Sequence, residues 1–176
     1  MAQADGVQPE RSMESRVGRA KQRYGPNGER LVAGVVPVST DRTQVLLIQS
    51  SARKGWVLPK GGWETDESTQ EEAACREAWE EAGIECSIVH DLGSIEERRR
   101  SNSDDAKAQK NGSHKNGNGG PGAMYRFYEV RVQEEKASWP EAHKRERMWM
   151  SYAKAKEALR ERPELSEALE RSSIKR

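Results

Sequence analysis

The chain has 176 residues, of which 34% are hydrophobic and 34% are charged, so it suits about one domain with length left for tails or an insertion. Its 30 basic and 29 acidic residues give a formal charge of +1, so only local clusters of charge can attract an anionic partner. Two cysteines exclude a disulfide-rich scaffold, and no apolar run approaches the roughly twenty residues of a membrane span.

The first 22 residues are polar and without a period, which predicts a flexible tail over 1–22 followed by one domain over 23–176. Because no apolar segment typical of a signal peptide is present, we expect a soluble protein of the cytoplasm, the nucleus or both. Cys75 and Cys86 have no metal-ligand spacing and are expected to remain reduced, as small core residues.

Two segments rich in valine, isoleucine and leucine, 30–38 and 43–50, predict the first strands, and 55–59 predicts a short third strand. Further strands are expected at 86–99, 124–132 and 147–150, and one or two closing helices within 152–172. The segment of about 101–122 has no large apolar residue and predicts a disordered loop inserted between two paired strands. Strands interleaved with helices predict an α/β fold of three layers, α/β/α.

The most acidic stretch is "GGWETDESTQEEAACREAWEEAGI", residues 61–84. Within it, "STQE" has the pattern of a capping box, which predicts that Ser68 caps a helix that Gly83 ends. Helical geometry gathers Glu77, Glu80 and Glu81 on one face, opposite the alanines that pack on the sheet.

Like charges at these spacings destabilise a helix by a few tenths of a kcal/mol per pair, so the arrangement needs compensation. Arg76 neutralises Glu80 at i+4, which leaves Glu77 and Glu81 as paired carboxylates of the kind that Mg²⁺ or Mn²⁺ prefers. The alternative is an ordinary solvated acidic face. The lysine and glycines at 60–62 favour the metal, because glycine lets the backbone approach a phosphate or a metal closely.

The acidic stretch resembles the Nudix box, which is Gly, five residues, Glu, seven residues, then Arg-Glu-aliphatic-x-Glu-Glu-x-Gly-aliphatic. The matching positions are Gly62, Arg76, Glu77, Ala78, Glu80, Glu81, Gly83 and Ile84. The first glutamate of the box falls on Ser68, with Glu67 one residue earlier, and we interpret this as a substitution that removes an outer acid. The resemblance implies the Nudix fold, a three-layer α/β/α sandwich with a mixed β-sheet.

The same resemblance implies hydrolysis of a phosphoanhydride, often in a nucleoside diphosphate linked to another moiety, by a metal-activated water. It implies Glu77 and Glu81 as ligands of Mg²⁺ or Mn²⁺, joined by the backbone carbonyl of Gly61 or Gly62. Glu80 is the expected general base, oriented by Arg76.

Outside the box, "RYGPNGERLVAGVVPV", "VLLIQSSARKGWVLPKGGWETDE" and "KRERMWM" are most similar to the diphosphoinositol polyphosphate and diadenosine polyphosphate hydrolases. That branch acts on highly anionic substrates, which suits the basic clusters here. The expected substrate contacts are Arg23, Arg30, Ser50, Ser51, Arg53, Lys60, Gly61, Arg98, Arg100, Lys144 and Arg145. For the charge runs the alternative is a solvated surface, and for the two serines it is simple strand termination.

Three functions remain open. The first is a hydrolase of diphosphoinositol and diadenosine polyphosphates. The second is another Nudix pyrophosphatase, acting on ADP-ribose, a nucleotide sugar or an mRNA cap, which would need an aromatic cradle from Trp56, Trp63, Tyr125 or Trp149. The third is a catalytically inactive module that binds polyphosphate or a partner protein. We expect a monomer with a small-molecule partner, and neither a membrane nor a nucleic acid.

Overall fold

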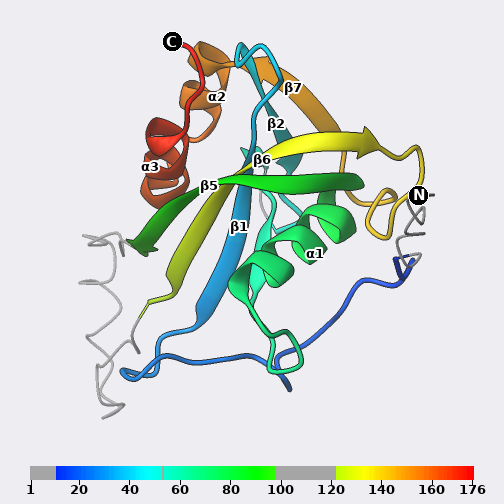
Figure 1. Ribbon diagram of the computed structural model, residues 1–176, viewed down its shortest axis with the longest axis vertical. Coiled ribbons are helices and arrows are strands. Elements are labelled where there is room, and N and C mark those ends of the chain that lie inside the picture. The colour runs from blue at the N-terminus through cyan, green and yellow to red at the C-terminus, as the bar shows by residue number, and fades with distance from the viewer. Residues whose placement is uncertain (1–10, 53, 98–121) are drawn as a thin grey trace, which may run out of the picture.

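The computed structural model describes residues 11–52, 54–97 and 122–176 (Figure 1). The first ten residues of the expected tail and nearly all of the expected insertion therefore lie outside the described residues. The strands on either side of that insertion pair in antiparallel fashion, as the sequence predicts.

A mixed sheet of four strands forms the centre of the molecule, in the order β4-β1-β6-β5. Its strands are β1 (Leu31–Pro37), β4 (Lys60–Gly62), β5 (Ile84–Glu96) and β6 (Met124–Glu135). β1 runs parallel to β6 and antiparallel to β4. The valines of β1 are buried on both faces, which explains why this segment reads as a continuous apolar run. β4 was not expected, because three half-buried residues with two glycines carry no strand pattern.

A second, antiparallel sheet has the order β3-β2-β7 and is made of β2 (Gln44–Gln49), β3 (Trp56–Val57) and β7 (Arg147–Ser151). Residues 45–48 of β2 are fully buried. Helix α1 (Gln70–Ala82) packs on β1, β4 and β5, while α2 (Tyr152–Ala158) and α3 (Pro163–Arg171) lie away from it, beside the C-terminus (Figure 1). This is the expected α/β/α arrangement, with two sheets in its central layer.

The start of α1 differs from the prediction by one residue. Thr69, not Ser68, is the N-cap: its side chain accepts a hydrogen bond from the backbone N–H of Glu72 at 3.2 Å. The carboxylate of Glu72 accepts in return from the backbone N–H of Ser68 at 3.1 Å. The capping box is thus "TQEE", residues 69–72, and not "STQE", residues 68–71. Gly83 ends the helix as expected, in the left-handed conformation with φ 65°.

Residues 11–22, which we call the N-terminal strap, run along α1 instead of forming part of a separate tail (Figure 1). Trp79 Nε1 donates to the carbonyl of Ser12 at 2.8 Å, and Ser15 Oγ donates to the carboxylate of Glu141 at 3.0 Å. These contacts attach Ser12 and Ser15 to the rest of the protein, and the boundary at residue 23 stays a prediction. The strap escapes sequence analysis because it is polar and its contacts are made one residue at a time.

Candidate active site

The three inner acids of α1 are buried. Glu77, Glu80 and Glu81 keep 8%, 4% and 9% of their surface exposed, although they lie opposite the alanines that pack on the sheet. The alternative of a solvated acidic face is therefore wrong. Buried carboxylates need partners, because an unpaired charge in an apolar setting is costly.

Arg76 is the partner that these acids share. Its Nη1 donates to Glu77 Oε1 and to Glu80 Oε2, both at 2.9 Å, so the pairing expected from the i+4 spacing is present. Its Nε and Nη2 donate to the two carboxylate oxygens of Glu67 at 2.9 and 3.0 Å, and Nη2 also reaches the carbonyl of Gly62 at 2.9 Å. One guanidinium thus fixes two acids of the helix and the loop before it.

Glu67 corrects the interpretation of the box. It is 2% exposed and takes the bidentate position on Arg76, whereas Ser68 is exposed. Five residues separate Gly61 from Glu67, and eight separate Glu67 from Arg76. Glu67 therefore takes the place of the outer acid, one residue farther from Arg76 than in the usual spacing. The sequence contains a signal for this: counting five residues on from Gly61 places the first glutamate of the box at Glu67, whereas counting from Gly62 places it at Ser68.

A cation bound beside Glu77 and Glu81 would offset the cost of burying their negative charges. Burial, followed by the charge of Glu81, raises the pKa of Glu77 to about 8, and burial raises the pKa of Glu81 to about 7. Burial also raises the pKa of Glu80. Glu81 Oε2 accepts from the backbone N–H of Lys60 at 3.0 Å, and Glu81 Oε1 accepts from Arg145 at 3.2 Å.

The backbone of β4 lies directly against this pair of acids. A Cβ at Gly61 would stand 2.1 Å from Glu77 Oε1, so any larger residue there would displace the Glu77 carboxylate. Two buried carboxylates beside an exposed backbone fit a hard divalent cation such as Mg²⁺ or Mn²⁺. Of the two carbonyls expected as ligands, that of Gly62 accepts a hydrogen bond from Arg76, and Gly61 pairs with Ala33 in the sheet.

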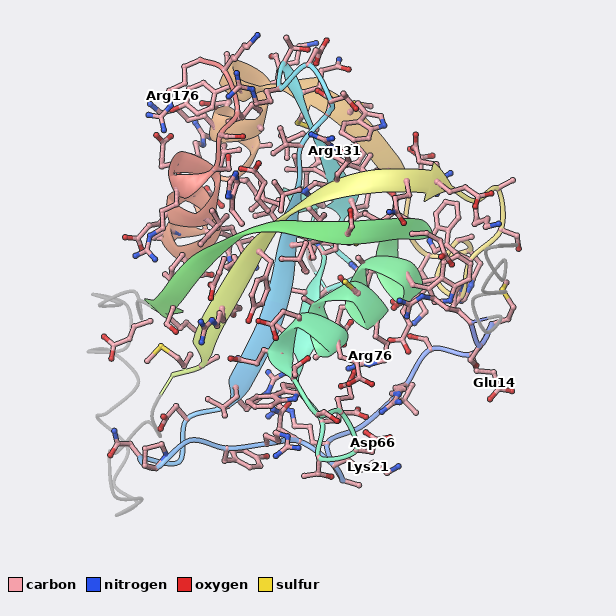
Figure 2. The ribbon with its side chains drawn as sticks, viewed as in Figure 1. Glu14, Lys21, Asp66, Arg76, Arg131 and Arg176 are labelled. Atoms are coloured by element: carbon pink, nitrogen blue, oxygen red, sulfur yellow. The ribbon has the colours of Figure 1, made fainter. Side chains whose placement is uncertain are left out.

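A second acidic cluster lies in the loop before α1. Carboxylate oxygens of Glu64, Asp66 and Glu67 lie within 4.8 Å of one another. Arg16 of the strap pairs with Glu64 and, at 2.7 Å, with Asp66, while Arg76 holds Glu67. Figure 2 shows Asp66 in the loop before α1 and Arg76 on the helix itself. Guanidinium groups thus pair with all three acids of this cluster.

A cavity of about 380 Å³ opens over the three inner acids. Its basic lining consists of Arg16, Arg19, Arg30, Lys60, Arg76 and Lys144, and Arg16 and Arg76 pair with acids as described above. Lys144 pairs with Glu141 at 3.7 Å, but within the described ranges no carboxylate forms an ion pair with Arg19, Arg30 or Lys60. Burial, and then the nearby charge of Arg19, lowers the pKa of Arg30, and burial lowers that of Lys60. Cations left without acids mark a place for an anion.

Two other expected substrate contacts, Arg23 and Arg145, are bonded to other groups of the protein. Arg23 lies over the ring of Trp63 at 4.5 Å and donates to the carbonyls of Glu64, Thr65 and Glu67, so it supports the loop before the helix. Arg145 is buried and joins Glu81, Glu141, Ser51 Oγ and the carbonyl of Gln49.

For Ser50 the structure gives a backbone bond to Gly55. Arg53, Arg98 and Arg100 lie outside the described residues. Arg16 and Arg19 are basic lining residues that the sequence does not predict, because both belong to the segment interpreted as a tail.

The sequence profile of the NUDIX domain matches residues 28–171. The chain belongs to the Nudix family. It is 41% identical over 167 residues to Nudix hydrolase 16, mitochondrial, of Arabidopsis thaliana, with 88% of this chain and 85% of that protein covered. Nudix hydrolase 17, mitochondrial, of the same plant is 36% identical over 165 residues, with 89% and 80% covered.

Among solved structures, a NUDIX hydrolase from Nitrosomonas europaea matches with a TM-score of 0.62 at 16% identity, covering 81% of this chain and 87% of that one. A C. elegans Ap4A hydrolase matches with a TM-score of 0.54 at 19% identity, covering 80% and 93%. At these identities the likeness shows the fold of the Nudix domain, and it agrees with the fold expected from the box.

The relatives correct one expectation of the sequence analysis. Nudix hydrolases 16, 17 and 13 of Arabidopsis thaliana all carry the word mitochondrial in their names, so the expected location in the cytoplasm or nucleus is wrong. No helix among the described residues is long and apolar enough to cross a membrane.

Proposed function

We propose that this Nudix protein hydrolyses a phosphoanhydride bond in highly anionic small molecules, with diphosphoinositol polyphosphates and diadenosine polyphosphates as its substrates. One observation carries the proposal: the cavity that contains the three buried glutamates of α1 also contains Arg19, Arg30 and Lys60, which lack acidic partners among the described residues. Acids that suit a divalent cation and cations that suit phosphates thus face the same volume.

In this proposal Glu77 and Glu81 hold Mg²⁺ or Mn²⁺, with the backbone at Gly61 beside them. When bound, the cation would supply an activated water and would neutralise charge on the phosphoryl oxygens. Arg19, Arg30 and Lys60 bind the remaining phosphates and stabilise charge on the leaving group.

Glu80 is the proposed general base. Arg76 fixes its Oε2, which leaves Oε1 to take the proton of the attacking water. The water oxygen forms a bond to phosphorus, and the bond from phosphorus to the bridging oxygen breaks with its electron pair on the leaving phosphate. In the described conformation Oε1 accepts a hydrogen bond from the backbone N–H of Arg16 at 3.0 Å, so the strap must give way for the water to approach.

The positions of the aromatic residues do not favour a substrate that is bound through stacking of its nucleobase. Of the four candidates for a cradle, only Tyr125 lines the cavity. Trp63 lies under Arg23 and donates to the carbonyl of Glu67, and Trp149 lines a different pocket beside β6. A polyphosphate recognised by its charge suits this lining better than ADP-ribose, a nucleotide sugar or an mRNA cap.

The direct test offers 5-diphosphoinositol pentakisphosphate, diadenosine hexaphosphate and ADP-ribose in parallel, with Mg²⁺, and measures release of phosphate and nucleotide. We expect turnover of the first two and a loss of at least about 100-fold in Glu80→Gln. Glu157→Gln, which changes an exposed acid of α2, serves as the matched control and should keep full activity. Cleavage of ADP-ribose alone would overturn the substrate assignment. Binding of polyphosphates without cleavage would instead make the protein an inactive binding module.

A further inference from the structure

The chain's two cysteines meet in the fold. Cys75 belongs to α1 and Cys86 to β5, and their Sγ atoms lie 3.9 Å apart. Both side chains are partly exposed, so neither is the enclosed core thiol that the sequence suggested. Because the chain contains no other cysteine, any intramolecular thiol chemistry must take place between these two.

The surroundings allow the two sulfur atoms to approach further. A disulfide requires a separation of about 2.05 Å, so the pair has to close by roughly 1.9 Å. Cys86 lies beside an irregularity of the ladder: one step along β5, from Glu85 to Cys86, spans two residues of β6, from Glu134 to Val132. Such a bulge leaves its extra residue unpaired and disrupts the ladder locally, so the pairing that holds β5 in place is incomplete beside Cys86. A change of side-chain torsion with a small strand shift can therefore close the bond.

We propose that Cys75 and Cys86 form a dithiol modification site, which a low-molecular-weight disulfide such as oxidised glutathione converts into an intramolecular disulfide. One cysteine thiolate attacks a sulfur of the small disulfide, forming a mixed disulfide and releasing one small thiol. The second thiolate then attacks the protein sulfur of that mixed disulfide and expels the second small thiol. The protein loses two hydrogens and two electrons, and the small disulfide gains them as two thiols.

The bond would join α1 to β5 directly beside the site. Cys75 precedes Arg76, whose guanidinium holds Glu67, Glu77 and Glu80. Pulling this turn of the helix towards β5 displaces Arg76 from its partners, so the oxidised protein should turn over more slowly. This consequence rests on the proposed hydrolase function, whereas formation of the disulfide does not.

The first test treats the reduced full chain with oxidised glutathione and measures the intact mass, followed by peptide mapping. We expect a loss of two hydrogen masses and a cross-linked peptide containing Cys75 and Cys86. Cys75→Ser and Cys86→Ser should each stop at the mixed disulfide and gain one glutathione. A mixed disulfide that persists in the unsubstituted chain, a disulfide between two chains, or two thiols that remain free would each overturn the proposal.

The second test compares turnover of the reduced and oxidised chain, before and after treatment with a dithiol reductant. We expect oxidation to lower kcat severalfold and reduction to restore it, with Cys86→Ser insensitive to both. Equal turnover in the two states would overturn the effect on the site. If neither state turns over any substrate, the proposed hydrolase function fails, while the mass measurement still decides whether the dithiol forms a disulfide.

Discussion

Arg76 is the residue on which the geometry of the site depends, because four groups accept hydrogen bonds from its guanidinium. Three of them are carboxylates that are almost completely buried. Breaking a buried ion pair by removing one partner is far more damaging than removing a surface pair, because the other charge is left uncompensated. Glu67, which binds Arg76 through both oxygens, should therefore matter although eight residues, and not the usual seven, separate it from Arg76.

Replacing Glu67 with glutamine tests this role. We expect Glu67→Gln to lower the free energy of unfolding by about 3 kcal/mol and kcat by about 10- to 100-fold, because Arg76 loses the partner that orients it. Ser68→Ala is the matched control: Ser68 is exposed and contributes a backbone bond, so both quantities should stay near those of the unsubstituted chain. Denaturant unfolding and steady-state kinetics measure the two effects. A larger loss of stability and kcat in Ser68→Ala than in Glu67→Gln would support the interpretation that Ser68 replaces the first glutamate of the box.

At the scale of elements, α1 must both pack against the sheet and hold several acids out of water. Its alanines pack on the sheet while its acids surround a cavity, and burial raises the pKa of both Glu77 and Glu81. The folded chain thus holds protons more tightly than the unfolded chain between the ordinary pKa of 4.5 and the raised values of about 8 and about 7. Stability must fall as pH rises through this range, because the folded state then has more protons to lose.

This behaviour is measurable in metal-free protein. We expect the free energy of unfolding to fall between about pH 4.5 and about pH 8, by at most about 1.4 kcal/mol per pH unit for each of the two acids. Saturating Mg²⁺ should flatten the decline, because metal binding stabilises the deprotonated acids. The double variant Glu77→Gln, Glu81→Gln should show a shallower decline, with only the raised pKa of Glu80 left to contribute. Stability that rises over this range without metal would show that the two acids are already compensated.

The sequence could predict the elements that have strong periods and could not predict those that depend on single contacts. β1, β2 and the end of α1 at Gly83 follow from apolar runs and a glycine, because burial decides them locally. β4 and the N-terminal strap carry no such pattern. The acids of α1 were identified as a group, but their burial and the position of Arg19 beside them depend on parts of the chain that are distant in sequence.

At the scale of the whole molecule, the N-terminal strap joins the loop before α1 to the cavity. Its Arg16 reaches the acidic cluster through the side chain and Glu80 through the backbone N–H, while Arg19 lines the cavity. The same segment thus covers the proposed base and contributes a cation to the substrate site. Exposed ion pairs of this kind contribute only about 0.2 to 1 kcal/mol each, so the strap is weakly held.

Loosening the strap should therefore favour turnover. We expect Arg16→Ala to raise kcat/KM by up to about fivefold, because weaker anchoring frees Oε1 of Glu80 for the attacking water. Arg11→Ala is the control, since Arg11 belongs to the strap but pairs with Glu85, away from the cavity. A fall in kcat/KM in Arg16→Ala would mean that the strap positions the base instead of covering it.

The central claim is that the acids of α1, and not those of the preceding loop, hold the catalytic metal. The most direct measurement is a titration with Mn²⁺ followed by electron paramagnetic resonance, which reports free and bound ion without requiring turnover. We predict tight binding in the unsubstituted chain and in Asp66→Asn, and loss of that binding in Glu81→Gln. Binding that survives Glu81→Gln and disappears in Asp66→Asn would move the metal to the cluster of Glu64, Asp66 and Glu67, and would contradict the account.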